Sequence, residues 1–466
     1  MTRSGRTLAA LVFLPCWACG SSTAPARTAP TPTPAASAVA TGTAVAPSPS
    51  AREGMAPVPP ASDETARIAT MLAQVQRVRQ LDATKSVPGV ELDRAALIAH
   101  VKAHVARELP PQAIRNEGLE LQLFGFLPTE YDYEGAEYDL LEEQLAGYYE
   151  PADGTMYLAS DLRADEADAT LAHELVHALQ DQHWDLERRS RYHQGAGDEA
   201  ETVSALAEGD ATSAMYDMIV PRVLGANATA LDVPDISGQI REGISQGPGA
   251  KAPSVMRSSL AAPYIYGTLF VNALRRQGGW AAVNRAWEEP PTTTEQLLHV
   301  EKWLAHEPAK AVSAPPFASL GSSWMPSDED SEGELGARTA FEEWLSLSDA
   351  AQVAGGWGGD RAVLVVNGDR AAFGWNMRYD AGLPGPPRAA RAFTLIARAL
   401  EHLLGPAASS DRDAVCHERK DRGPIAIAHK GLDLIVTLGP AHVGPWSSAG
   451  NCALAMKWIR EIEATR

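Results

Sequence analysis

The chain has 466 residues, of which 45% are hydrophobic and 21% are charged. These proportions are those of a folded globular protein, and the length allows two or three domains with full-sized cores. The 40 Lys and Arg residues are outnumbered by 59 Asp and Glu residues, which gives a net charge of −19. Such an acidic balance argues against nucleic acid as a partner.

The N-terminus has the pattern of an export signal. Arg3 and Arg6 precede a short apolar run over residues 8–14. A basic start followed by a short apolar core is typical of a secretory signal, and this core is too short to span a bilayer as a helix. We therefore expect residues 1–18 to be a signal peptide.

The sequence Ala18-Cys19-Gly20 follows the apolar run and resembles a bacterial lipoprotein cleavage site, in which Cys19 would carry the lipid. Cys16 stands where an aliphatic residue is usual, so a plain secretory signal is the alternative. Residues 19–62 are rich in Ala, Pro, Thr and Ser and are expected to form a disordered tether. The expected location is the bacterial cell envelope, with the protein lipid-anchored to a membrane on the periplasmic side or at the cell surface.

Residues 63–314 are expected to form one mainly helical domain. Apolar residues recur at three- and four-residue spacing in several segments of this region. The pair Asp153-Gly154 lies between two aromatic-rich runs and predicts a hairpin over residues 148–158. The expected helices cover residues 65–82, 92–107 and 138–147, one that begins near residue 165, and residues 198–218, 264–277 and 280–287.

The C-terminal part has a different pattern. Residues 315–337 are rich in Pro, Ser and acidic residues and are expected to be a linker to a small α+β domain over residues 338–466. Asn367-Gly368-Asp369 predicts a hairpin turn, and Trp357-Gly358-Gly359-Asp360-Arg361 is interpreted as a tight turn before a strand. The order of expected elements is strand, strand, helix, twice over: residues 362–366, 371–379, 388–404, 425–429, 432–438 and 452–464.

This C-terminal domain shows no catalytic constellation in its sequence. It does contain Cys416 and Cys452, which are the two cysteines that remain beyond the signal region. An exported location permits these two residues to form a disulfide, but the sequence does not show whether their Cα atoms are close enough.

The most informative motif is His173-Glu174-Leu175-Val176-His177, an HExxH sequence. Residues four apart on a helix lie roughly 40° apart around its axis, so both imidazoles can reach one metal ion. Glu174 lies beside them, where a carboxylate can take a proton from a metal-activated water. The motif therefore predicts half of a zinc site together with a catalytic base.

A third protein ligand is needed to complete a catalytic zinc site. His183 lies six residues after His177, as in metzincins, but Gln180 occupies the place of the glycine at which the chain turns back. If the helix continues, His183 lies roughly 240° around the axis from His177 and cannot reach the same ion. The sequence also resembles the gluzincin pattern, in which a glutamate on a later helix completes the site, and this resemblance implies Glu208 as the third ligand, with Glu201 as its rival.

With Glu208 as the third ligand, the pattern HExxH…E resembles that of gluzincin metallopeptidases, the group that includes the thermolysin-like and aminopeptidase-N-like enzymes. The sequence Glu208-Gly209-Asp210-Ala211 is also similar to an EGDA pattern in bacterial lipoproteins that carry HExxH. In aminopeptidase-N-like enzymes the ligand glutamate is likewise followed by glycine, but the asparagine that precedes it there is Ala207 here. The resemblance implies a zincin-like fold and one bound zinc ion.

The segment Pro263-Tyr264-Ile265-Tyr266-Gly267 resembles the aminopeptidase-N-like segment whose tyrosine stabilises the oxyanion. The resemblance places this role on Tyr264, with Tyr266 as the second candidate. His299 is a weaker alternative donor. It also implies that the strands at residues 147–158 border a cleft for an extended peptide.

Together these features predict a zinc peptidase that acts on a peptide or protein substrate. Glu174 would be its general base and His173, His177 and Glu208 its metal ligands. The alternative is a non-catalytic surface lipoprotein that serves as a binding or assembly module on a zincin-like fold.

Overall fold

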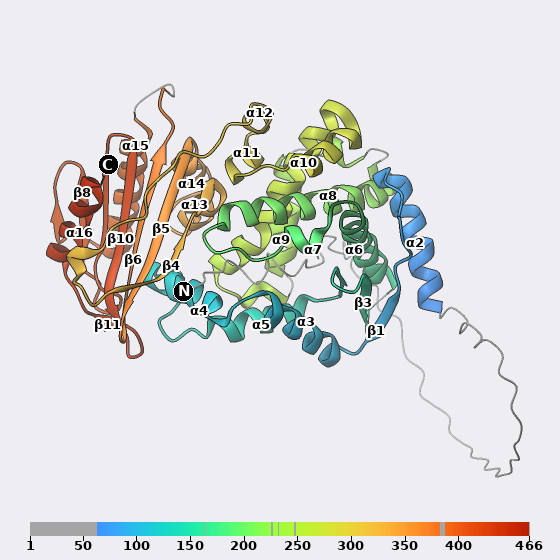
Figure 1. The fold of residues 1–466 in the computed structure, drawn as a ribbon, viewed down its shortest axis with the longest axis horizontal. Helices are drawn as coiled ribbons and strands as arrows, with labels where there is room; N and C mark the ends of the chain where they lie inside the picture. The colour runs from blue at the N-terminus through green and yellow to red at the C-terminus, as the bar shows by residue number, and fades with distance from the viewer. Residues whose placement is uncertain are drawn as a thin grey trace, which may run out of the picture.

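The computed structural model describes residues 63–465 apart from 163, 225–226, 232, 247 and 383–386. The expected signal peptide, the lipidation site Cys19 and the tether lie outside the described residues. In the part that is described, no helix has both the length and the apolar character needed to cross a membrane. The described chain is a mixed α and β structure with two sheets (Figure 1).

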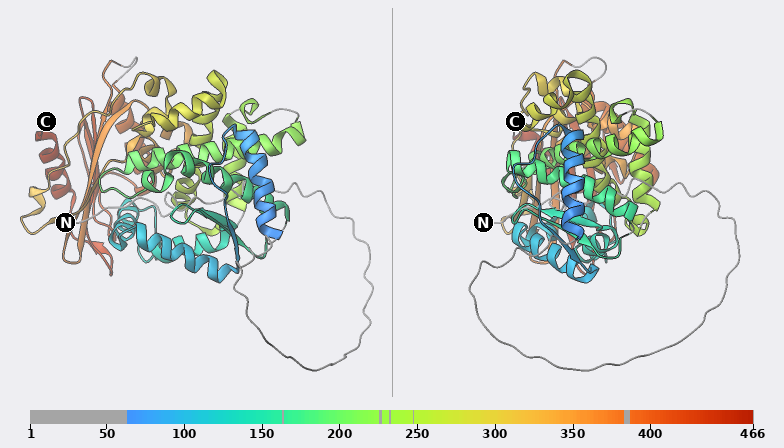
Figure 2. Two further views of the ribbon diagram at one scale, coloured as in Figure 1. Left: turned by 45° about the vertical axis from the view of Figure 1, so that its right-hand side comes forward. Right: turned by 90° about the vertical axis from the view of Figure 1, so that its right-hand side faces the viewer.

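The first part of the chain is mainly helical and surrounds one continuous hydrophobic core. Its first helices are α2 (Asp63–Arg79), α3 (Arg94–Glu108), α4 (Pro111–Phe124), α5 (Tyr133–Gln144), α6 (Ala164–Trp184), α7 (Leu186–Arg189) and α8 (Gly197–Leu224). They are followed by η1 (Ala228–Ala230), α9 (Val233–Gln246), η2 (Pro248–Lys251), α10 (Ser254–Glu288), α11 (Thr294–Leu298) and α12 (Val300–Leu304). Helix α2 lies on the outside of this helical part (Figure 2).

Helix α10 differs from the two separate helices expected at residues 264–277 and 280–287. It begins ten residues earlier, at Ser254, and contains Pro263. The first turns are buried through side chains such as Val255 and Leu260, and this burial outweighs the hydrogen bond lost at the proline. The expected break is present, since Gly278 and Gly279 have non-helical dihedral angles.

A small sheet lies beside α6. Its strands are β1 (Gly89–Leu92), β2 (Gly147–Glu150) and β3 (Thr155–Ala159), in the order β1-β3-β2. The predicted hairpin is confirmed: β2 and β3 are antiparallel, and Gly154 turns between them with φ of 70°. Strand β2 is therefore an edge strand of this sheet.

The second part of the chain is built on an eight-stranded sheet. Its strands are β4 (Met325–Asp330), β5 (Trp357–Asn367), β6 (Arg370–Tyr379), β7 (Ser409–Ser410), β8 (Ala414–His417), β9 (Ile425–Lys430), β10 (Asp433–His442) and β11 (Ser447–Ser448). The spatial order is β4-β5-β6-β10-β9-β8-β7, with β11 paired to β10, and the pairs are antiparallel.

Helices cover both faces of the large sheet. Beside the short η3 (Ala318–Leu320), they are α13 (Gly333–Glu342), α14 (Leu347–Ala354), α15 (Arg388–Leu404) and α16 (Cys452–Ala464). Alternate residues of β5 show the two faces: Leu364 packs with α13, α14 and α15, whereas Val363 and Val365 pack with α16. Figures 1 and 2 show α16 on the outer side of the sheet.

The predicted linker over residues 315–337 is wrong. This segment contains η3, strand β4 and the start of α13. Its polar composition suggested solvent exposure, but β4 pairs with β5 along its length, with one register shift between Pro326 and Asp328. Asp330 is buried, and one of its oxygens accepts a hydrogen bond from the backbone N–H of Gly197. The same ladder enlarges the C-terminal domain beyond the expected two strand pairs.

The predicted turn at residues 357–361 is also wrong, because these residues begin β5, with a register shift between Trp357 and Gly359. Asp360 explains the unusual sequence. It is buried and accepts hydrogen bonds from the indole N–H groups of Trp357 and Trp375 and from the backbone N–H groups of Glu332 and Gly333. Asp360 thus joins the sheet to the turn before α13.

The two C-terminal cysteines are bonded. Cys416 on β8 and Cys452 at the start of α16 form a disulfide with their Cα atoms 5.7 Å apart. The bond attaches the outer helix α16 to the edge region of the sheet.

Candidate metal centre

Helices α6 and α8 bring three candidate ligands together in the interior. His173 Nε2 lies 3.0 Å from Glu208 Oε2 and 3.2 Å from His177 Nε2, and His177 Nε2 lies 3.8 Å from the same carboxylate oxygen. All three residues are buried, and one ligand atom from each lies within 4.8 Å of the others. This group could hold a metal ion.

The apolar stripe of α6 determines where its histidines point. Leu171, Leu175 and Leu179 are completely buried in the helical core. The adjacent face of α6, which carries the two histidines, then faces α8. The helix continues to Trp184, as expected from Gln180. His183 accordingly points elsewhere, and its Nε2 pairs with the carbonyl oxygen of Asp82 at 2.7 Å.

A close crossing of α8 and α10 positions Glu208. Gly209 and Gly267 meet at this crossing, where a Cβ atom on Gly209 would overlap the backbone of Gly267. A Cβ atom on Gly267 would in turn overlap the carbonyl of Ala205. Only glycine allows this approach, and it brings Tyr264, one turn before Gly267, next to the ligand group.

Asp210 anchors the same segment of α8. Its carboxylate accepts hydrogen bonds from the guanidinium of Arg79 at 2.6 and 3.1 Å and from the indole of Trp287 at 2.9 Å. Arg79 and Asp210 are both fully buried, and Arg79 also lies over the ring of Trp280. Three consecutive residues therefore fix this segment of α8. Glu208 faces the two histidines, Gly209 contacts α10, and Asp210 pairs with Arg79.

Glu174 lies in the interior beside the ligand group. Its Oε2 accepts a hydrogen bond from the backbone N–H of Tyr149 on β2 at 2.9 Å. Its Oε1 is buried and has no hydrogen-bond partner among the described residues. Burial disfavours the charged carboxylate and raises the pKa of Glu174 to about 8.

The charge state of the ligands follows from burial and from their mutual contacts. Burial lowers the pKa of His173. Burial also opposes the charged form of Glu208, but hydrogen bonds from both histidines outweigh it and lower the pKa of this carboxyl. Burial opposes the charged form of His177 as well, yet Glu208 more than compensates and raises its pKa to about 9. A buried carboxylate thus faces two imidazoles.

Of the three candidate oxyanion donors, the structure brings only Tyr264 to the ligand group. Its ring centroid lies 6.0 Å from that of His173, and the residue is buried. Tyr266 instead packs under the guanidinium of Arg338, at 4.7 Å. His299 lies 3.0 Å from the carboxylate of Glu334 on α13.

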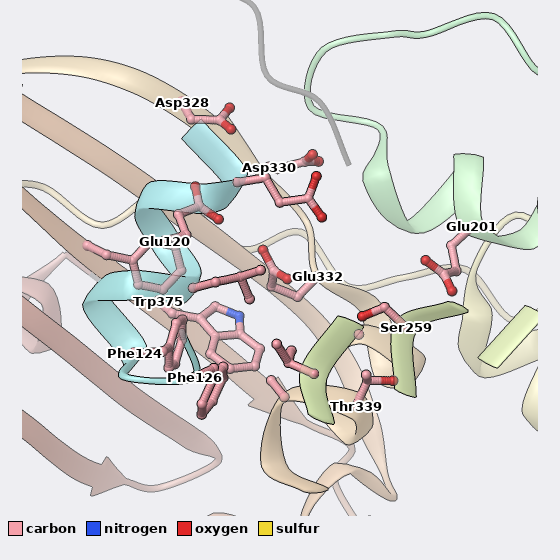
Figure 3. Close-up of a pocket in the computed structure, with 16 residues that line it drawn as sticks. Glu120, Phe124, Phe126, Glu201, Ser259, Asp328, Asp330, Glu332, Thr339 and Trp375 are labelled. Atoms are coloured by element: carbon pink, nitrogen blue, oxygen red, sulfur yellow. The ribbon is translucent and has the colours of Figure 1, made fainter. Parts of the chain in front are cut away.

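Glu201 does not join the ligand group. It lines a pocket between α4, α10, α13 and the large sheet, opposite other carboxylates and above an aromatic wall (Figure 3). The labelled acidic residues of this pocket are Glu120, Glu201, Asp328, Asp330 and Glu332, and the aromatic ones are Phe124, Phe126 and Trp375. Asp198, near the start of α8, is buried and accepts hydrogen bonds from the backbone N–H and the hydroxyl of Thr294.

A second acidic group, Glu295, Glu307 and Asp380, also has its oxygens close together. The ammonium of Lys302 lies among them, at 2.6, 2.9 and 2.5 Å. The ammonium of Lys302 therefore already supplies a cation among these oxygens, and the group connects α11 and α12 to the residue that follows β6.

Sequence reasoning missed Gln180 as part of the site. Its Oε1 lies 2.8 Å from His177 Nδ1, and its Nε2 donates to the carbonyl oxygen of Ala207 at 3.0 Å. The sequence offered one signal, namely a polar residue three positions after His177, which helix periodicity places on the same side of the helix.

No protein-family model and no curated protein matches the chain. Among solved structures, a protein from Chloroflexus aurantiacus described as a candidate hydrolase with a novel fold is similar over 54% of this chain and 92% of its own. The sequence identity is 18% and the TM-score is 0.30. A TM-score this low does not establish a shared fold.

Proposed function

We propose that the protein is a zinc-dependent peptidase whose helical part, residues 63–314, is zincin-like. The observation that carries the proposal is the convergence of His173, His177 and Glu208 in the interior, with the free oxygen of Glu174 beside them. Two imidazoles and one carboxylate are a ligand set of catalytic zinc sites, which keep a further position open for water or substrate.

A zinc ion held by these three residues would supply Lewis acidity, which activates water and polarises a carbonyl group. The residues of the chain have separate tasks beside it. The Tyr149 N–H holds one oxygen of Glu174, so that the other can take a proton from the attacking water and pass it to the leaving amine. The hydroxyl of Tyr264 donates a hydrogen bond to the developing oxyanion.

An extended peptide is the substrate that best suits the surroundings of Glu174. Strand β2 is an edge strand, and its residue Tyr149 contacts Glu174 through the backbone N–H. An edge strand next to the catalytic base can align a peptide through main-chain hydrogen bonds. We therefore propose a peptide or protein as the substrate.

We also propose that the protein works outside the cytoplasm, anchored through a lipid on Cys19. The disulfide between Cys416 and Cys452 supports an oxidising compartment. Labelling of the wild type with a radioactive fatty acid, but not of a Cys19→Ala variant, is the expected result. Equal labelling of the two proteins would exclude this anchor.

The peptidase proposal is tested with the wild type and the Glu174→Gln variant. Both are expected to contain one zinc ion per chain, because Glu174 is not a ligand. The wild type should cleave members of a proteome-derived peptide library, and the variant should be slower by a factor of about 10² or more. Full activity in the variant would refute Glu174 as the base. A zinc-free wild type without cleavage would favour a non-catalytic envelope module.

A further inference from the structure

We infer that Gln180 is a positioning residue of the metal centre, which fixes the tautomer of His177 and couples it to the backbone beside Glu208. The inference rests on the metal centre of the proposed function, and not on the identity of its substrate. Gln180 is completely buried between α6 and α8, and it makes one contact to each helix.

The hydrogen bonds of Gln180 determine the orientation of its amide. A backbone carbonyl oxygen can only accept a hydrogen bond, so the group facing Ala207 O at 3.0 Å must be the amide NH₂. The amide oxygen then faces His177 Nδ1 at 2.8 Å, and this nitrogen must carry the proton. His177 Nε2, on the other side of the ring, is therefore the nitrogen that binds a metal ion when the imidazole is neutral.

The same amide connects two ligands that come from different helices. Ala207 immediately precedes Glu208, so the hydrogen bond from Gln180 fixes α8 at the point where the carboxylate leaves it. His173 has no equivalent support, since its Nδ1 is buried without a hydrogen-bond partner among the described residues. Gln180 therefore orients His177 and the Glu208 segment as one unit, and partners of this kind tune the affinity of a metal site.

Metal affinity, measured without any substrate, is the appropriate test. The dissociation constant for zinc is measured by competition with a chelator, and the visible spectrum is recorded after cobalt substitution. In Gln180→Met, which has a similar volume and no polar groups, the zinc dissociation constant should rise about 10- to 100-fold and the cobalt bands should shift. Gln180→Glu keeps an acceptor for His177 Nδ1–H but loses the donor to Ala207, so its zinc dissociation constant should lie between those of the wild type and Gln180→Met.

Gln182 provides a matched control on the same helix. Its side chain also bonds to backbone groups, those of Thr84 and Lys85, but on the side away from the ligands. Gln182→Met should lower thermal stability without changing the zinc dissociation constant or the cobalt spectrum. If Gln180 had only a structural role, Gln180→Met would likewise lower thermal stability and leave the zinc dissociation constant and the cobalt spectrum unchanged.

An unchanged zinc dissociation constant in a folded Gln180→Met protein would overturn the inference and leave the proposed function intact. A wild type that binds no zinc would overturn both. If Gln180→Met does not fold, Gln180→Asn tests the same contacts, because the shorter amide cannot reach both His177 and Ala207. Wild-type zinc affinity in Gln180→Asn would likewise contradict the role of Gln180.

Discussion

Glu201 and Glu208 are seven residues apart on α8, so their side chains leave the same face about 10 Å apart along the axis. Only Glu208 reaches the two histidines. Glu208→Ala should therefore lose bound zinc on dialysis, whereas Glu201→Ala should retain one ion per chain, as measured by elemental analysis of the dialysed proteins. Loss of zinc from the Glu201 variant alone would show that Glu201, and not Glu208, is the third ligand.

Glu137 allows a prediction on pH and stability. It is buried on α5, and burial raises its pKa from 4.5 to about 7 although it has a hydrogen bond with Tyr133. Because the folded state holds this proton more tightly, its contribution to stability is complete below the unfolded pKa and is lost as the pH rises through 7. Glu137→Gln should therefore be more stable than the wild type at pH 8, by about 1–3 kcal/mol.

Urea unfolding of the wild type and Glu137→Gln at pH 5 and pH 8 measures this difference. At pH 5 most wild-type molecules carry the proton, so the advantage of the variant should shrink. A difference in unfolding free energy that is the same at both pH values would show that Glu137 does not titrate in this range.

At the level of residues, local geometry explains what could be predicted. The spacing of His173 and His177 predicts their shared helix face, and the missing glycine at Gln180 argues against His183, because both follow from helix periodicity. Glu208 follows from the resemblance to the gluzincin pattern and not from local geometry. The hydrogen bond from Gln180 to Ala207 could not be predicted, since it joins two helices whose relative position depends on packing. The burial of Asp198 could not be predicted for the same reason, because its partner Thr294 is 96 residues away.

At the level of secondary structure, the crossing of α8 and α10 is the most sensitive point near the ligands. Gly209→Ala would place a methyl group into the backbone of α10, so the helices must move apart. The expected cost is about 2–4 kcal/mol of unfolding free energy, together with weaker zinc binding as Glu208 is displaced.

Gly238→Ala on α9 is the matched control for Gly209→Ala. Gly238 is exposed, and an added Cβ would meet no atom within 4 Å. Alanine should be neutral there or stabilising by up to about 1 kcal/mol, through its better helix propensity. Thermal unfolding and zinc affinity of both variants check this contrast, and equal effects of the two substitutions would contradict the importance of the crossing.

Elements with a local signal were easier to predict than elements that depend on a partner. The turns at Gly154 and Gly368 mark hairpins that the structure contains, since both glycines have positive φ. Strand β4 has no apolar alternation, and it forms because β5 offers a free edge. The start of α10 before Pro263 likewise depends on the core into which it packs.

At the level of the whole molecule, the two parts are packed together and share side chains. Leu123 and Phe124 at the end of α4 belong to the core under the large sheet, and Arg419 and Arg422 bond to carbonyl groups at the end of that helix. Lys302 and Gly197 add polar contacts between the two parts, to the carboxylates of Asp380 and Asp330. The chain therefore folds as two connected parts rather than as two domains on a linker.

The disulfide provides a test at this scale. Cys416 and Cys452 are 36 residues apart in sequence, and loop-closure entropy predicts that replacing both with Ser costs about 3–4 kcal/mol of unfolding free energy. Zinc content should be unchanged, because both cysteines lie in the second part of the chain. Chemical denaturation monitored together with zinc release checks both expectations. Loss of zinc before unfolding would show that α16 affects the metal centre.

The buried pair of Arg79 and Asp210 has a consequence for how this sequence can evolve. Loss of either residue would leave a charge in the interior without its counter-ion, a change that costs several kcal/mol. The two positions should therefore change together in homologues or not at all. Since Asp210 follows the ligand Glu208 by two residues, this epistasis extends from the metal centre to α2. In a homologue that lacks Arg79, we expect the helix that corresponds to α2 to pack differently against α8.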